Sequence, residues 1–172
     1  MGFGRSAFTE EQLKKLEPFI GEIGSKSTTY FIAITRIYFP FLTYEVKYSA
    51  TALNIADRQN AYSITITVRG VVELYKAVKR KKELYREILA YLISHNYRSV
   101  RIYGYYAIIE EDNTTFYRHL IYTFDFTALD GKDKWTAYKF IKNVYDIWMP
   151  LHLERIYSAI DNLPSNIAFD LS

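Results

Sequence analysis

The sequence contains no cysteine, so disulfides, thiolate chemistry and zinc sites built on cysteine are all excluded. Its three histidines, His95, His119 and His152, are widely spaced and form no ligand pair. A phosphate-binding P-loop, a glycine-rich dinucleotide fingerprint and the nucleophile elbow of a hydrolase are also missing. The sequence therefore lacks the short motifs of common nucleotide-binding proteins and serine hydrolases.

Long hydrophobic runs are absent too, since no stretch approaches the ~20 apolar residues that a membrane helix needs. The N-terminal segment MGFGRSAFTEEQLKK has no apolar centre and is not typical of a secretory signal. The formal net charge is only +3. We therefore expect an intracellular protein, in the cytoplasm or nucleus, without a membrane partner. Any anionic partner would have to be held by a local basic patch.

The residues that are present are typical of a globular protein. The chain has 172 residues, of which 49% are hydrophobic and 24% are charged, and this balance predicts a single domain over residues 1–172. Aromatic residues make up 17%, and 17 residues are tyrosines. Tyrosine can bury its ring and keep its hydroxyl in water, so these residues suit either a core with its rim or a binding face.

Turn and helix signals divide the first half of the chain into three elements. The capping-box pattern Thr9–Gln12 predicts a short helix that ends near Leu16, before Pro18. The segment Phe41–Ser49 is predicted to be a strand. From residue 50 to residue 82, apolar and small residues recur at steps of three and four, which favours a long helix. A local β-branched run inside that segment, Ile64–Val68, favours a strand instead.

The second half of the chain predicts a sheet followed by helices. Three segments with strand-like composition or alternation are separated by turn residues: 86–95, 99–109 and 115–126. A helix is expected to carry Trp135 to Trp148, to be interrupted at Pro150, and to be followed by a second helix over 151–162. This order predicts an α/β (α+β) domain with a mixed central sheet flanked by helices.

The strand Phe41–Ser49 carries two opposite charges, Glu45 and Lys47, which alternation places on the same face. One interpretation is an ordinary ion pair on an edge strand, worth less than ~1 kcal/mol. The apolar neighbours of this pair instead predict a strand covered on both faces, where charge is costly without a partner. A strand carboxylate and the adjacent Val46 carbonyl could hold Mg²⁺, and a lysine could position water for phosphodiester hydrolysis.

Glu45-x-Lys47 on a strand, followed at once by a helix with Gln59, resembles the core of the PD-(D/E)XK nuclease-like superfamily. Longer segments are similar to a group of largely uncharacterised fungal proteins with a C-terminal domain of that fold. These segments are YFPFLTYEVK, ADRQNAYS, VRGVVELY, SVRIYGYY, YTFDFTALDGKDKWTAYKF and NVYDIWMP. The resemblance implies a restriction-endonuclease-like core. It also implies Glu45 as a metal ligand, Lys47 as the catalytic lysine, Gln59 as a polar residue near metal or phosphate, and Mg²⁺ or Mn²⁺ as cofactor.

One part of the superfamily pattern is missing, because no aspartate precedes Asp57 in this chain. The superfamily places an aspartate on a strand before the Glu-x-Lys strand. Three alternatives follow: the chain is clipped before Met1, a glutamate such as Glu22 substitutes, or catalysis has been lost. The expected function is thus metal-dependent phosphodiester hydrolysis or a degenerate derivative. The alternative is a non-catalytic module that binds nucleic acid or a protein, as in a fungal host-interaction or conflict protein.

A basic run near the end of the long helix adds a candidate contact surface for nucleic acid. The expected contacts to phosphate are Arg58, Lys79, Arg80, Lys81 and Lys82. A solvated helix end, paired locally with Glu83 and Glu87, explains the same run without a partner. The sequence does not distinguish these two interpretations, and it does not specify an oligomeric state.

Overall fold

The computed structural model describes residues 1–20, 32–34, 37–46, 50–110, 113–125 and 127–164, with only the backbone for 19–20, 32–34, 50–63 and 129. The elements in chain order are β1 (Phe3–Gly4), η1 (Arg5–Ala7), α1 (Glu10–Ile20), β2 (Ile32–Ile34), β3 (Ile37–Tyr38), β4 (Leu42–Val46), α2 (Ala50–Ala77), η2 (Lys81–Leu84), β5 (Ile88–His95), β6 (Ser99–Ile109), β7 (Thr114–Asp125), η3 (Leu129–Gly131), α3 (Thr136–Asn143), the π-helical turn η4 (Val144–Trp148) and α4 (Met149–Asp161).

A four-stranded mixed sheet in the order β4-β5-β6-β7 forms the centre of the fold. β4 and β5 run parallel, and α2 connects them, while β5, β6 and β7 are successively antiparallel. A smaller sheet in the order β1-β3-β2 lies near the N-terminus. The predicted α/β class, with a mixed sheet flanked by helices, is confirmed.

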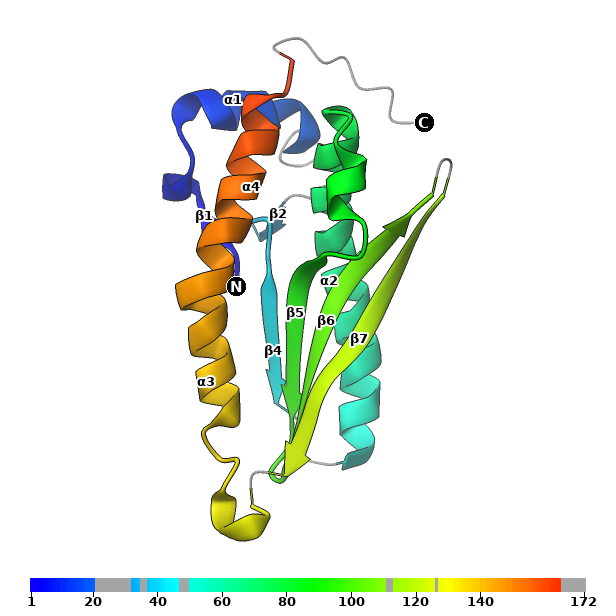
Figure 1. Ribbon diagram of the computed structural model, residues 1–172, viewed down its shortest axis with the longest axis vertical. Coiled ribbons are helices and arrows are strands. Elements are labelled where there is room, and N and C mark those ends of the chain that lie inside the picture. The colour runs from blue at the N-terminus through cyan, green and yellow to red at the C-terminus, as the bar shows by residue number, and fades with distance from the viewer. Residues whose placement is uncertain (21–31, 35–36, 47–49, 111–112, 126, 165–172) are drawn as a thin grey trace.

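Helices cover the two faces of the sheet unequally (Figure 1). On one face lies α2, whose Arg69 contacts the Phe116 ring of β7. On the other face, the Tyr91 ring of β5 meets the rings of Phe140 and Trp148 at centroid distances of 5.3 and 4.9 Å. The rod formed by α3, η4 and α4 lies beside β4 and β5, and no described helix lies in front of β7 (Figure 1).

The predicted long helix is confirmed, although it ends earlier than expected. Its predicted core-facing residues Thr67, Val71 and Leu74 are buried, so packing against the sheet overrides the local preference of the β-branched run. The helix ends at Ala77, not Lys82, because Lys79 adopts a positive φ of 59°. The backbone N–H of Arg80 then donates to the backbone carbonyl of Tyr75 at 2.9 Å, which closes a Schellman cap.

Two predictions based on proline were wrong. The capping box exists, with reciprocal bonds of 3.1 and 3.2 Å between Thr9 and Gln12, but α1 continues through Pro18 to Ile20. Pro150 does not separate two helices either, since it lies in the first turn of α4 directly after η4. The π-helical turn shifts the hydrogen-bond register before the proline, which lets the helix continue despite the missing N–H.

The N-terminal residues pack across the helical rod and bury a histidine. The His152 ring stacks on Trp148 at 4.3 Å between centroids and lies 6.4 Å from the Phe3 ring. Its exposed fraction is 4%. Burial, helped by the nearby charge of Arg155, lowers the pKa of His152 from 6.5 to about 3, so the ring is neutral inside the core.

Candidate functional site

Glu45 lies near the carboxyl end of β4, at the edge where the parallel strands β4 and β5 both end. Its side chain is half-buried. The strand containing it is covered only in its first part, because Tyr44 and Val46 are 48% and 53% exposed. The prediction that both faces of the whole strand are covered was therefore wrong, since β4 is an edge strand of the main sheet.

The strand register places three polar residues in one row with Glu45. Glu45 is the parallel partner of Ser94, Ser94 pairs with Arg101, and Arg101 pairs with Thr123. Directly paired residues share a face of the sheet, so the row crosses all four strands on one side. This is the α2 side, because Arg101 and Ala107 have the same parity on β6 and Ala107 pairs with Phe116, which contacts Arg69.

This row is suited to a phosphodiester group more than to a bare cation. The half-buried Arg101 has five N–H donors that can reach phosphate oxygens, whereas Ser94 is fully buried and lies beneath this surface. Glu45 and the Val46 carbonyl would supply two oxygen ligands to Mg²⁺. Among the described residues, no group of three or more His, Cys, Asp or Glu side chains could hold a metal ion. The described part of the donor set therefore does not fit a complete Mg²⁺ site.

Three predicted site residues cannot be placed at the level of side chains. Lys47 lies outside the described residues. Arg58 and Gln59 lie in the first part of α2, whose backbone alone is described. Gln59 thus lies on the helix that follows β4, as the resemblance implies. Glu22, the candidate substitute for the missing aspartate, also lies outside the described ranges.

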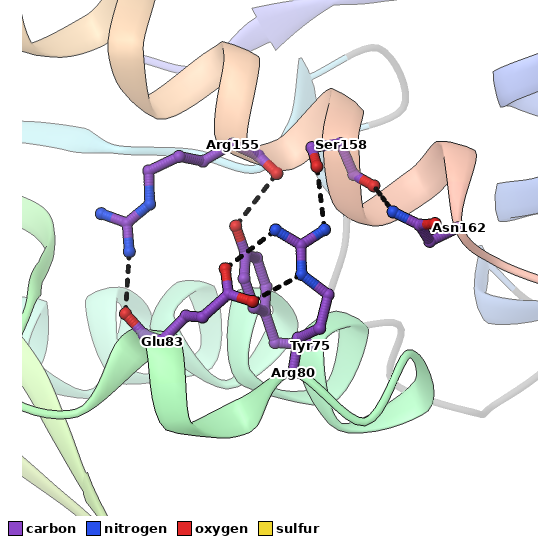
Figure 2. A network of polar contacts seen from close by, with 6 residues as sticks. All are labelled: Tyr75, Arg80, Glu83, Arg155, Ser158 and Asn162. Carbon is purple, nitrogen blue, oxygen red and sulfur yellow. Dashed lines mark hydrogen bonds and ion pairs between the residues drawn. The ribbon is translucent and has the colours of Figure 1, made fainter.

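The basic run beyond α2 contributes to a structural network at the end of that helix (Figure 2). The Arg80 guanidinium donates to both carboxylate oxygens of Glu83 at 2.7 and 2.8 Å, and to the Ser158 hydroxyl at 2.8 Å. Arg155 donates to the Glu83 carbonyl at 3.0 Å, and Tyr75 donates to the Arg155 carbonyl at 3.0 Å. The hydrogen bond from Arg80 is the main cause that lowers the pKa of Glu83. Arg80 thus anchors α4 to the end of α2.

The lysines beside Arg80 in the basic run differ from it in their surroundings. Lys79 and Lys82 are exposed, and Lys81 begins η2. A contact between phosphate and Lys79, Lys81 or Lys82 stays a prediction. Tyr103 and Tyr105, which flank Gly104 on β6, are buried in the sheet and belong to its core.

A second charged group lies on β7 at the same end of the sheet. Asp125 accepts hydrogen bonds from the backbone N–H and hydroxyl of Thr127 at 2.9 and 2.6 Å, and it also pairs with Arg98. The hydrogen bonds from Thr127, followed by the one from Arg98, lower the pKa of Asp125 to about 2. The carboxylate is therefore ionised at neutral pH and holds the turn that follows β7.

Sequence reasoning missed Ser94, Arg101 and Thr123. Each lies at an ordinary alternating position of a strand, and the only signal in the sequence was that parity. Their association with Glu45 depends on the register between strands that are separated in the chain by α2 and two turns. This register cannot be read from the pattern of any one strand.

The fold and this row define an α/β domain with a polar row at the carboxyl end of its parallel strand pair. Residues 1–160 match the family described as Domain of unknown function (DUF7924), and the chain belongs to that family. No curated protein and no solved structure gives a significant match. None of the helices in the described ranges has both the length and the apolarity that a bilayer span requires.

Proposed function

We propose that this domain is a nuclease-like domain that binds the phosphodiester backbone of nucleic acid, as a degenerate derivative of the PD-(D/E)XK superfamily. The observation that supports this proposal is the polar row on the α2 face: the Glu45 carboxylate lies in register with Ser94, Arg101 and Thr123. Arg101 of this row is a half-buried donor suited to phosphate, and a helix follows the Glu45 strand, as the resemblance requires.

The second form of the proposed function is hydrolysis of the phosphodiester, in which Glu45 would be a metal ligand. A strand–helix–strand unit with parallel strands places Glu45 at the carboxyl end of the pair, which is where open α/β sheets bind ligands. Lys47, two residues later in the sequence, would share that face by alternation. Bound Mg²⁺ or Mn²⁺ would polarise the phosphoryl group. The described ligands do not complete the metal site.

The test combines binding and cleavage on the same protein. The purified chain is mixed with a fluorescent DNA duplex, a single-stranded RNA and a supercoiled plasmid, with Mg²⁺, Mn²⁺ or EDTA. Binding without cleavage, strengthened a few-fold by Glu45→Gln, supports the degenerate form, because the substitution removes a negative charge from the Arg101 row. Cleavage in Mg²⁺ or Mn²⁺ that is lost in both Glu45→Gln and Lys47→Ala supports the hydrolytic form.

A matched control separates the site from general charge effects. Glu17→Gln removes the same charge from an exposed position on α1, outside the main sheet, and is expected to leave binding unchanged. Equal effects of Glu17→Gln and Glu45→Gln would place the site elsewhere. A chain that neither binds nor cleaves any of the three substrates would contradict the proposed function. Capture of a specific protein partner by that chain would then favour the predicted alternative, a protein-binding module.

A further inference from the structure

Aromatic rings position two arginines on the α2 side of β6 and β7. The Arg69 guanidinium of α2 lies over the Phe116 ring, with Cζ 5.4 Å from its centroid. The Arg118 guanidinium of β7 lies over the Tyr103 ring, with Cζ 5.0 Å from its centroid. Both arginines are exposed, whereas Tyr103 is buried. A guanidinium stacked on a ring is held in one orientation and directs its N–H donors within its own plane.

A third arginine extends this pair toward Glu45. Arg101 precedes Tyr103 by two residues on β6, so both face α2, and Arg101 is half-buried. It pairs with Thr123 of β7, seven residues along the strand from Phe116. Seven residues of a strand span about 23 Å. The three arginines are therefore spread along one strand direction over about that length, and the row of Arg101 ends at Glu45.

We propose that Arg69, Arg101 and Arg118, here called the arginine strip, bind the phosphate backbone of a nucleic acid along β7. The inference rests on the proposed function, and it names the surface that would lead the backbone to the Glu45 row. Arginine is suited to this role because its planar donors match phosphate oxygens in pairs. One strand of a DNA duplex carries a phosphate every ~3.4 Å of rise, so a span of about 23 Å is matched by about seven phosphates.

The arginine strip differs in setting from the basic run that the sequence favours. The Arg80 guanidinium is bound to the carboxylate of Glu83 and to Ser158. Lys76 likewise pairs with Glu73 at 2.9 Å. In the arginine strip, Arg69 and Arg118 each lie over an aromatic ring, which orients the guanidinium group. We therefore expect the phosphate contacts on the β7 side of α2, not at its C-terminal end.

Salt dependence of binding tests this inference directly. Affinity for a fluorescent 20-base-pair DNA duplex is measured by anisotropy between 50 and 200 mM salt for the wild type and for the triple variant Arg69→Gln, Arg101→Gln, Arg118→Gln. Three phosphate contacts contribute about 2.7 to the slope of log K against log salt, or about 40-fold in affinity over this range. The triple variant should lose that part of the slope, and each single variant should lose about 0.9.

Two sets of variants control for charge and for folding. Lys14→Gln and Lys139→Gln remove equally exposed charges from α1 and from α3 and should leave the slope unchanged. Arg69→Lys and Arg118→Lys keep the charge and should retain most of the slope, which shows whether a loss in the glutamine variants reflects misfolding. The inference would be overturned if the Lys→Gln controls lost as much of the salt slope as the Arg→Gln variants, or if the triple variant kept the wild-type slope. Either result would leave the proposed function intact.

The remaining outcomes separate the two proposals. If the wild type does not bind the duplex at 50 mM salt, the arginine strip fails. The proposed function fails with it only if the chain also neither binds nor cleaves the single-stranded RNA and the plasmid. If it binds anionic phospholipid vesicles with the same dependence on the three arginines and ignores the duplex, the surface recognises phosphate in a membrane, and the nucleic-acid assignment is wrong. Duplex binding that depends on the strip but not on Glu45 supports the strip and moves the site away from Glu45.

Discussion

The buried histidine of the helical rod should make the domain sensitive to mild acid. His152 is 4% exposed and stacks on Trp148 at 4.3 Å. Its pKa is about 3 in the folded state against 6.5 for an exposed histidine. Between these values the unfolded chain binds one more proton than the folded one, so the free energy of unfolding falls as the pH falls below 6.5. Above pH 6.5 the contribution of the neutral ring to stability is fully present.

The magnitude follows from the size of the pKa shift. Each pH unit within the window lowers the free energy of unfolding by about 1.4 kcal/mol, which gives about 2 kcal/mol between pH 7 and pH 5. His152→Phe keeps an aromatic ring against Trp148 and Phe3 but removes the titrating group. Because carboxylates titrate in both proteins, we expect the difference between wild type and variant, not either value alone, to change by about 2 kcal/mol over this range.

Urea unfolding followed by tryptophan fluorescence, at half-unit steps from pH 7 to pH 4.5, measures this difference. His119→Gln, at an exposed position on β7, is the control and should follow the wild-type curve. Should His152→Phe lose stability in parallel with the wild type, His152 would not be the acid-sensitive group. His152→Gln provides the same comparison if phenylalanine proves too apolar or too rigid at this position.

Two further substitutions test the packing of the sheet and the end of α2. Gly104→Ala should destabilise the domain by about 1–2 kcal/mol, because the new Cβ would lie 2.7 Å from Cδ1 of Ile88. The double variant with Ile88→Val, which removes that Cδ1 atom, should recover part of the lost stability. Chemical denaturation of the single and double variants measures both effects. Lys79→Gly should raise the free energy of unfolding by about 0.5–1 kcal/mol, since glycine adopts the φ of 59° without a side-chain clash. Thermal unfolding measures this gain, and Lys82→Gln controls for the loss of one positive charge.

Most of the fold could be predicted from periodicity, and the errors came from local backbone chemistry. The steps of three and four that include Thr67, Val71 and Leu74 outweighed the β-branched run beside them, and the structure confirms that choice. The end of α2 was missed because a lysine occupies the left-handed position where glycine is the usual signal. Pro150 was interpreted as a helix break because a π-helical turn has no recognisable sequence signature.

The candidate site could be predicted only in part. Glu45 was found because its alternation and its resemblance to a nuclease core can be read within one segment. Its neighbours Ser94 and Arg101 belong to other strands, and they join it only once β4 pairs with β5 and β5 with β6. The predicted burial of the second part of β4 failed for a related reason. A run of apolar residues does not show whether its strand lies at the edge or in the middle of a sheet.

The arginines show why a count of basic residues along the chain is a weak guide to an anion site. Arg80 belongs to the densest basic run, yet its charge is matched by Glu83 and its donors bind α4. Arg118 stands among aromatic and apolar residues in the sequence, but the fold places it over Tyr103 and in line with Arg69 and Arg101. A phosphate backbone responds to the field of groups that face it together. The relevant cations are therefore those that share one face of the sheet, and sequence proximity alone does not identify them.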